Sequence, residues 1–374
     1  MGEGLMKAIA LVPGTNRLRL ADRPEPEIAA SDDVKVRVLQ VGICGTDREE
    51  AAGGRAEAPP GADELVIGHE MLGQVVEVGP AVSDAPPGDY AVFTVRRGCG
   101  RCPACAVDRS DMCYTGDYAE RGIKARDGYQ AEYVVDSTRH MVKVPSELVS
   151  VGVLTEPMSV AEKALDEATR VQVSRLPDAD GATDWLRGKQ VLVAGLGPIG
   201  LLAAFALRLR GASVLGLDVV DRDSSRPVLL RSIGGEYVDG RQMEAQKLAD
   251  RFGHIDVVLE ATGVAHLEFD LLSALGTNGA YVLTGVPGGD RPMSIDGADL
   301  VRRLVLGNQV MVGSVNADHA HFRMAVDDLL KAQEAWGEAM GRVVSHRLPY
   351  TDFAGALSRH PPDEIKTVLE WAPL

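Results

Sequence analysis

"GKQVLVAGLGPIGLLAAFALRLRGASVLGLDVV", residues 188–220, carries the strongest indication of the fold class. Its apolar run 190–194 predicts a short, buried strand of a parallel sheet. A G-x-G-x-x-G motif follows and opens an apolar helix that ends at Gly211, and a second apolar run, 213–217, leads to Asp218. A glycine motif between strand and helix, with an acid about twenty residues further on, is the fingerprint of a dinucleotide-binding unit. The motif consists of Gly195, Leu196, Gly197, Pro198, Ile199 and Gly200.

The same residues bear on the choice of cofactor. Glycines let the backbone approach a pyrophosphate, and the N-terminus of a helix favours its negative charge. The Asp218 carboxylate would accept hydrogen bonds from the adenosine ribose and would repel a 2′-phosphate. Val219 and Val220 follow it, and the next basic residue is Arg222. We therefore expect NAD to be preferred over NADP. The alternative for Asp218 is a solvated charge at the end of a strand.

Three later apolar runs continue the alternation of strand and turn. They lie in 255–263, 279–289 and 309–317, and each ends in small or polar residues. Ligands of open α/β sheets bind beyond the carboxyl ends of the strands. The residues expected near the nicotinamide half of the cofactor are Thr284, Gly285, Val286, Ser314, Val315 and Asn316.

Four of the five cysteines stand together in "GCGRCPACAVDRSDMC", residues 98–113. They are Cys99, Cys102, Cys105 and Cys113, with the spacing C-x2-C-x2-C-x7-C. Four thiolates can close a tetrahedron around zinc and leave no position for a substrate. Disulfides and an iron–sulfur cluster are the alternatives, although a cytosolic chain argues against disulfides. The spacing favours a structural zinc site that folds the loop.

The fifth cysteine, Cys44, lies in "VGICGTDRE", and His69 and Glu70 follow in "VIGHEMLG". Cysteine, histidine and glutamate are all zinc ligands, and three protein ligands plus water make an open, catalytic site. Glu156 in "LTEPMSV" is a candidate fourth ligand or water-mediated partner. Alternatively, it is an acidic residue that the dipole of a helix N-terminus favours. Likewise, a lone cysteine on an apolar strand is often no more than a small hydrophobe.

The bulk properties exclude several classes of protein. The chain has 374 residues, which favours two domains. Its formal net charge of -15 disfavours binding to nucleic acid. There is no apolar run of about 18 residues that would predict a membrane span. The first residues lack a secretory signal pattern, so we expect a cytoplasmic enzyme.

The order of these motifs resembles the zinc-dependent medium-chain alcohol dehydrogenases over almost the whole chain. Finer stretches, such as "CGTDRE", "TEPMSVAEKAL" and "VGSVNA", are similar to the microbial glucose (aldose) 1-dehydrogenases. The resemblance implies oxidation of the C1 hydroxyl of an aldopyranose to the lactone with NAD(P). It further implies two zinc ions per subunit and a homodimer or homotetramer. A polyol or threonine dehydrogenase of the same superfamily is one alternative, and a non-catalytic NAD-binding protein is a remote one.

The resemblance also implies roles for particular residues. Those implied to contact the sugar are Thr46, Glu120, Glu156 and Asn316, and Thr46 would also pass the substrate's proton towards solvent. The implied cofactor contacts are Leu196 to Ile199, Asp218, Val219, Thr284 to Val286, Ser314 to Asn316, and Lys366. Two departures from the family pattern stand out. Val95 replaces an asparagine that some members use for the sugar, and Val219 and Val220 replace arginines of NADP-preferring members.

The implied fold is α/β and discontinuous. Residues 1–158 and 317–374 would form a β-rich, GroES-like catalytic domain that carries the cysteine loop. Residues 159–316 would form a Rossmann domain with a doubly wound parallel sheet. His319 and His321 stand at the return to the first domain. We interpret them as exposed histidines of a loop or helix start, because nothing nearby completes a metal site.

Overall fold

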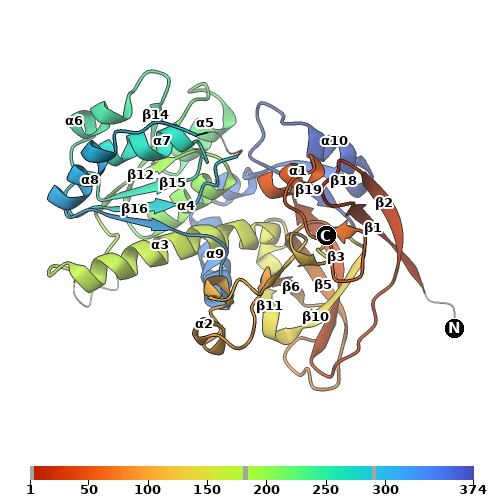
Figure 1. Ribbon diagram of the computed structural model, residues 1–374. Helices are drawn as coiled ribbons and strands as arrows, with labels where there is room; N and C mark the ends of the chain where they lie inside the picture. The colour runs from red at the N-terminus through yellow and green to blue at the C-terminus, as the bar shows by residue number, and fades with distance from the viewer. Residues whose placement is uncertain (1–3, 180–183, 289–291) are drawn as a thin grey trace. The chain divides into compact units, whose positions relative to one another are not determined.

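The computed structural model describes residues 4–179, 184–288 and 292–374, which fold into two compact units (Figure 1). Unit 1 comprises Met1–Ser159, Asn316–Gln333 and Val344–Leu374, and unit 2 comprises Val160–Val315 and Glu334–Val343. Residues 334–343, which the expected boundary assigns to the catalytic domain, belong to unit 2. There, helix α9 (His319–Gly341) is kinked at Trp336, whose ring meets that of Phe205 edge-on at 5.9 Å between centroids.

Unit 2 is built on a parallel sheet with the strand order β14-β13-β12-β15-β16-β17. The strands are β12 (Gln190–Ala194), β13 (Ser213–Asp218), β14 (Glu236–Asp239), β15 (Val257–Glu260), β16 (Ala280–Leu283) and β17 (Val310–Gly313). The helices of this unit are α4 (Pro198–Leu209), α5 (Ser225–Ser232), α6 (Leu248–Phe252), α7 (Ala265–Asp270) and α8 (Gly297–Leu306). The chain progresses from β12 to one edge and from β15 to the other, so the switch point lies between these two strands. This arrangement confirms the predicted doubly wound sheet.

Helix α4 connects β12 to β13 and is the most deeply buried helix of the unit. Pro198 stands in its first turn, where a missing N–H costs nothing, and every residue from Gly200 to Leu207 is buried. Gly211, just past its end, has φ +77°, a conformation that glycine adopts without steric strain. The helix is short, and no helix of the described residues is long and apolar enough to cross a membrane.

Unit 1 is rich in antiparallel strands. Its larger sheet has the order β11-β6-β5-β3-β19-β18, with β10 also paired to β3, and smaller sheets have the orders β2-β1-β4 and β7-β8-β9. The strands are β1 (Leu5–Leu11), β2 (Leu18–Pro24), β3 (Asp33–Gly42), β4 (Leu65–Val66), β5 (Glu70–Val78), β6 (Tyr90–Phe93), β7 (Arg96–Arg97), β8 (Ala119–Arg121), β9 (Ala125–Arg126), β10 (Tyr133–Ser137), β11 (Met141–Val144), β18 (Val344–Pro349) and β19 (Lys366–Glu370). Its helices are α1 (Gly45–Ala51), α2 (Pro103–Ala106) and α10 (Phe353–Ser358), while α3 (Thr155–Arg175), like α9, has residues in both units.

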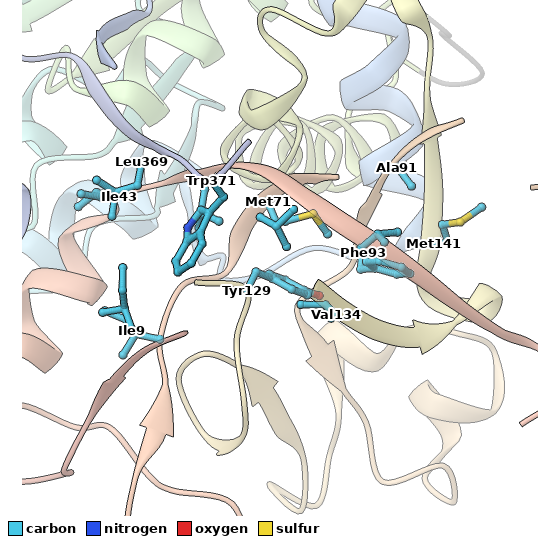
Figure 2. Packing of buried hydrophobic residues seen from close by; sticks show 14 of the residues in the cluster. Ile9, Ile43, Met71, Ala91, Phe93, Tyr129, Val134, Met141, Leu369 and Trp371 are labelled. Atoms are coloured by element: carbon cyan, nitrogen blue, oxygen red, sulfur yellow. The ribbon is translucent and has the colours of Figure 1, made fainter. Parts of the chain in front are cut away.

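A cluster of buried aromatic and aliphatic side chains forms the core of unit 1 (Figure 2). Trp371 stacks on Tyr350 with 4.3 Å between ring centroids, and its indole N–H donates to Gln130 Oε1 at 2.7 Å. Tyr129 stacks on Phe93 at 6.3 Å. Each large side chain that is fully buried contributes about 1.5–3 kcal/mol of hydrophobic free energy. Trp371, which directly follows the last strand β19, is therefore held in the core by Tyr350 and Gln130.

The register of three strands brings distant parts of the chain to one point. β3 pairs antiparallel with β5 so that Gly42 faces Glu70, and β19 pairs with β3 so that Val368 also faces Gly42. A Cβ atom on Gly42 would overlap the Glu70 carboxylate, so any larger residue here would displace that carboxylate. Cys44 follows β3, while Glu70 begins β5 and Lys366 begins β19. The pairing of these strands therefore places Cys44, Glu70 and Lys366 close together.

A buried carboxylate among three arginines joins the small sheet to the larger one. Asp136 on β10 is 3% exposed and accepts hydrogen bonds from Arg97 at 2.5 Å and from Arg121 at 2.7 Å, while Arg126 lies 3.5 Å away. Burial alone would raise the pKa of Asp136, but the three guanidinium groups outweigh it and hold that pKa well below its usual range. The Asp136 carboxylate therefore provides a negative charge that stabilises all three guanidinium groups.

The start of α9 corrects one expectation. His321 is 2% exposed and its Nδ1 lies 2.8 Å from Asp318 Oδ1. The prediction of an exposed histidine is wrong here, because the ring packs inward against the carboxylate that also accepts the His321 backbone N–H. His319, half-buried, hydrogen-bonds through Nε2 to the carbonyl of Met141 at 2.8 Å.

Asp136→Asn tests the arginine cluster. Removing one partner from a buried ionic group leaves uncompensated charge, so we expect the free energy of unfolding to fall by about 3–5 kcal/mol in denaturant titrations near pH 7. The folded pKa is depressed, so the stabilisation is complete above the unfolded pKa of about 3.9 and is lost as the pH falls below it. The matched control is Asp117→Asn, because Asp117 pairs with Arg101 at an exposed site. Equal stability of the two variants would contradict the interpretation.

Candidate active site

Three potential metal ligands of different chemistry converge at the meeting point of β3, β5 and β19. One ligand atom from each of Cys44, His69 and Glu70 lies within 4.8 Å of the others. His69 and Glu70 are buried, at 5% and 2% exposure, whereas Cys44 is half-buried. One thiolate, one imidazole and one carboxylate are zinc ligands, and the partial exposure of Cys44 leaves an open side. The structure therefore brings together the three residues that the sequence singled out.

A buried aspartate orients two of these residues. Asp47, one turn into α1, accepts the Cys44 backbone N–H at 2.7 Å, and its other oxygen lies 3.5 Å from His69 Nδ1. Burial lowers the pKa of His69, but Asp47 and Cys44 outweigh it and raise that pKa well above the ordinary value. A carboxylate on the Nδ1 side of a histidine fixes the ring and leaves Nε2 for a metal. The neighbouring Glu50 is buried, and burial together with Asp47 raises its pKa to about 8.

Glu70 has a second partner that the sequence did not suggest. The Lys366 ammonium donates to both Glu70 oxygens at 2.6 Å and to the carbonyl of Ile43 at 3.1 Å. Lys366 is 2% exposed. The negative charge of Glu70 stabilises its ammonium group more than burial destabilises it, so the pKa of Lys366 is raised. We expected Lys366 to contact the cofactor. In the described structure its charged end is bound to Glu70, and the contact to the cofactor stays a prediction.

Glu156 and Thr46 lie around the cluster without joining it. Glu156 is in the first turn of α3, and its carboxylate is not among the atoms within 4.8 Å of one another. Burial and the nearby Glu70 raise its pKa to about 7, against the opposing effects of His69 and Lys366. A carboxyl group that is partly protonated near neutral pH can both donate and accept a hydrogen bond. Thr46, half-buried, is in the first turn of α1.

The four cysteines of 98–113 form a second cluster. Their sulfurs all lie within 4.8 Å of one another, and all five cysteines of the chain are free thiols. A Cβ atom on Gly98 would overlap the Cys105 sulfur, so the loop closes around the thiols only with glycine there. A hydrogen bond from Thr115 lowers the pKa of Cys113 to about 6, whereas burial raises that of Cys105 to about 12. Four converging thiols suit a closed structural zinc site.

The glycine motif sits at the switch point of the parallel sheet. Gly195 has φ +88°, and a Cβ atom on Gly200 would overlap the Gly195 carbonyl, so helix and strand approach closely only with glycines. The Leu196 N–H donates to Asp218 Oδ2 at 2.8 Å, and the Val219 N–H donates to Oδ1 at 2.7 Å. The carboxylate is therefore fixed at the end of β13, where a ribose would bind.

The other predicted cofactor positions lie where the sheet topology requires. β16 ends directly before Thr284, and β17 ends directly before Ser314. Val286 and Val315 are exposed, at 60% and 56%, which suits residues that line a binding surface. Thr284 donates from Oγ1 to the carbonyl of Glu260 at 2.7 Å. Sequence reasoning missed Arg226 on α5, whose guanidinium lies 3.7 Å from Asp218 Oδ2.

Two predicted sugar-contacting residues meet in unit 1. Asn316 donates from Nδ2 to Glu120 Oε1 at 2.8 Å, although they are far apart in sequence. Arg96 also donates to Glu120 Oε1, at 3.0 Å, and sequence reasoning missed it because a buried arginine leaves no distinctive pattern. Val95, the departure from the family pattern, is 2% exposed.

Comparisons with known proteins assign the family. The family described as "Alcohol dehydrogenase GroES-like domain" matches residues 30–146, and the one described as "Glucose dehydrogenase C-terminus" matches residues 149–371. The domain pair and the ligand cluster define a zinc-dependent medium-chain dehydrogenase. Within that superfamily, the chain belongs to the glucose dehydrogenase family and is an NAD(P)-dependent oxidoreductase.

Individual relatives match over their full length. The chain is 36% identical to the glucose 1-dehydrogenase of Methanocella arvoryzae, covering 98% of this chain and 99% of the relative. It is 39% identical to glucose 1-dehydrogenase 1 of Caldivirga maquilingensis, covering 99% and 100%. Among solved structures, glucose dehydrogenase of Haloferax mediterranei in complex with NADP, Zn and gluconolactone matches with a TM-score of 0.87 at 33% identity, covering 99% and 100%.

Proposed function

We propose that this protein oxidises the C1 hydroxyl of an aldopyranose, with D-glucose as the expected substrate, to the aldonolactone while reducing NAD(P). The observation that carries the proposal is the convergence of Cys44, His69 and Glu70 in a chain that also holds the dinucleotide motif. The Haloferax relative was solved with gluconolactone, the product of this reaction, which supports an aldose over a polyol or an amino alcohol.

Different residues would hold the metal, bind the cofactor and relay the proton. Cys44 and His69, with Glu70 or Glu156, would hold zinc, which acts as a Lewis acid on a substrate hydroxyl when bound. NAD(P) bound at the glycine motif supplies the hydride acceptor. Thr46, two residues after Cys44, accepts a hydrogen bond from the substrate hydroxyl and relays its proton by donating its own hydroxyl hydrogen towards solvent.

Substrate recognition falls to the polar residues around the cluster. Glu120 and Asn316 hydrogen-bond sugar hydroxyls, and their mutual bond fixes both side chains before the sugar arrives. Glu156, with its pKa raised to about 7 by burial, offers either a proton or a lone pair to a further hydroxyl. A buried valine at position 95 offers none, so one contact present in some relatives is absent from this set.

The cofactor preference follows from two charges at the end of β13. The fixed Asp218 carboxylate favours the ribose hydroxyls of NAD and repels a 2′-phosphate. Arg226, 3.7 Å away, supplies a cation that weakens this repulsion. NAD is therefore preferred and NADP is accepted, in keeping with the NADP bound in the Haloferax relative.

The cysteine cluster suits a second zinc ion, which gives two per subunit. Its four thiolates would be the complete ligand set, so this ion stabilises the loop and takes no part in the reaction. Thiols that stay reduced suit a cytoplasmic location.

An exposed apolar face on unit 2 supports a homo-oligomer, either a dimer or a tetramer. Val301, Val305 and Leu306 on α8 are 56%, 67% and 75% exposed. β17 is an edge strand of the parallel sheet and is only half-buried. An edge strand beside an apolar helix face pairs readily with a second copy of itself. We assign this face to the subunit interface.

The function is tested by substrate and by metal content. We expect D-glucose, galactose or xylose to be oxidised faster than sorbitol or threonine, with about two zinc ions per subunit.

Cys44→Ser should lose one zinc ion, and its rate of glucose oxidation should fall about 10³-fold, because several kcal/mol of Lewis-acid assistance disappear. Its melting temperature should stay near that of the wild type. Cys102→Ser should lose the other zinc and melt at a lower temperature. Undiminished glucose oxidation by Cys44→Ser would refute the proposal.

The cofactor preference is tested by exchanging two charges. Asp218→Asn removes the repulsion of the 2′-phosphate and should lower the KM for NADP about tenfold, whereas Arg226→Gln should raise it about tenfold. The KM for NAD should change less than that for NADP in Arg226→Gln. Arg231→Gln, on the same helix but paired with Asp223, is the matched control and should change neither. An equal effect of Arg226→Gln on both cofactors would contradict the assignment.

The interface is tested by adding charge to the apolar face. Val305→Lys should shift the protein to a smaller species in size-exclusion chromatography with light scattering, because a buried, unpaired lysine opposes association. Leu374→Lys adds the same charge at a position that is 49% exposed in unit 1 and should leave the mass unchanged. A Val305→Lys variant with the wild-type mass places the interface elsewhere.

A further inference from the structure

We propose that Arg96 is a positioning residue through which the cysteine loop orients Glu120 and so sets the KM for the sugar. The inference rests on the proposed sugar-binding role of Glu120. The metal site of the loop itself would be closed to substrate. The loop would nevertheless influence substrate binding, in addition to stabilising the fold.

Arg96 and Glu120 face one another across two short strands. β7 pairs antiparallel with β8 so that Arg96 is directly opposite Glu120. The arginine is 7% exposed, and its Nε and Nη2 both lie 3.0 Å from Glu120 Oε1. Its guanidinium also stacks on the ring of Tyr118 at 4.0 Å from the centroid. A planar fork held on one face by an aromatic ring has a single orientation, and so therefore has the carboxylate that it binds.

The other end of the guanidinium is held by the cysteine loop. Arg96 Nη1 donates to the carbonyl of Asp111 at 2.7 Å. Asp111 lies in the 3-10 turn Ser110–Met112, directly before Cys113, so the placement of its carbonyl depends on how the loop closes. The Ser110 hydroxyl, from the same turn, donates to the Arg96 carbonyl at 3.3 Å. The loop thus holds both the backbone and the side chain of Arg96.

The contacts continue and return to the second sugar-contacting residue. Arg109 binds both carboxylate oxygens of Asp111, at 2.9 and 3.0 Å, and its Nε lies 3.0 Å from Asp318 Oδ2. Asp318 is two residues after Asn316, which donates to Glu120 at 2.8 Å. The polar groups form a closed ring from Glu120 through the loop to the 316–318 segment and back.

The ring presents the Glu120 carboxylate in one defined way. Arg96 and Asn316 both donate to Oε1, and Oε2 takes part in neither contact. Oε2 is therefore the oxygen that accepts a sugar hydroxyl. Without Arg96 the carboxylate keeps only the bond from Asn316 and is held less firmly, so its bond to the sugar weakens equally in the ground and transition states. A uniform loss of that kind raises KM and leaves kcat nearly unchanged.

A double-mutant cycle tests the proposal. Arg96→Gln, Glu120→Gln and the double variant are compared with the wild type for KM and kcat on D-glucose, for KM on NAD, and for gluconolactone affinity by calorimetry. We expect each single substitution to raise the glucose KM about tenfold and to weaken gluconolactone binding to match. The double variant should be no worse than Glu120→Gln alone, because Arg96 acts through Glu120. The KM for NAD should not change.

The outcomes distinguish the sugar-binding role of Glu120 from the positioning role of Arg96. If Glu120→Gln leaves the glucose KM unchanged, the proposed role of Glu120 fails. If Glu120→Gln raises that KM but Arg96→Gln does not, or if the two effects multiply, the positioning role of Arg96 is refuted while the function stands.

Two further variants guard against a general loss of structure. Arg97→Lys alters the adjacent buried arginine, which binds Asp136 and Thr94 rather than Glu120, and should lower thermal stability with the glucose KM unchanged. Arg96→Lys keeps the charge but not the fork, and should recover only part of the glucose affinity. A raised glucose KM in Arg97→Lys, or full recovery in Arg96→Lys, would overturn the proposal.

Discussion

The ion pair between Glu70 and Lys366 is the interaction on which the arrangement of unit 1 depends. Two charges at 2% exposure are stable only because the ammonium reaches both carboxylate oxygens at 2.6 Å and a backbone carbonyl besides. Losing either partner would leave an uncompensated buried charge, at a cost of about 3–5 kcal/mol. The pair joins the first residue of β5 to the first residue of β19. The C-terminal part of the chain is thereby fixed beside the segment that carries Cys44.

The same pair governs how Glu70 can serve a metal. Its two oxygens are occupied by one cation in the described structure, so direct ligation would require Glu70 to share its charge between Lys366 and the ion. Glu156 differs, because burial raises its pKa to about 7 and Lys366 acts on it only through its charge, without a hydrogen bond in the described structure. In the proposed ligand set Cys44 and His69, which Asp47 orients, would be the constant members. The remaining protein ligand would then be decided by competition between Glu70, which is paired with a lysine, and Glu156.

Sequence patterns predicted those parts of the site whose residues are neighbours along the chain. The strand, glycine motif, helix and Asp218 follow one another along the chain, and the structure places them as expected because their geometry is set by neighbouring residues. The spacing of four cysteines within one loop was equally informative. Arg96 and Asp47 were missed, because what makes each important is a partner supplied by tertiary contact. A purely local pattern also gave no reason for residues 334–343 to leave the first unit, which depends on how the Trp336 ring packs.

The missed residues have a common physical character. Asp47 and Arg96 are buried charges that orient another charged or metal-binding group, as is Lys366, whose bond to Glu70 the sequence did not suggest, and each of the three is at least nine-tenths buried. A buried charge is tolerated only where its partners are fixed, so each of these residues requires a rigid surrounding frame. The frame in turn is built from strand registers and from a loop closed by thiols. The exposed side of Cys44 is thus surrounded by a frame of buried ionic groups, and we expect substitutions at those groups to act on binding through geometry.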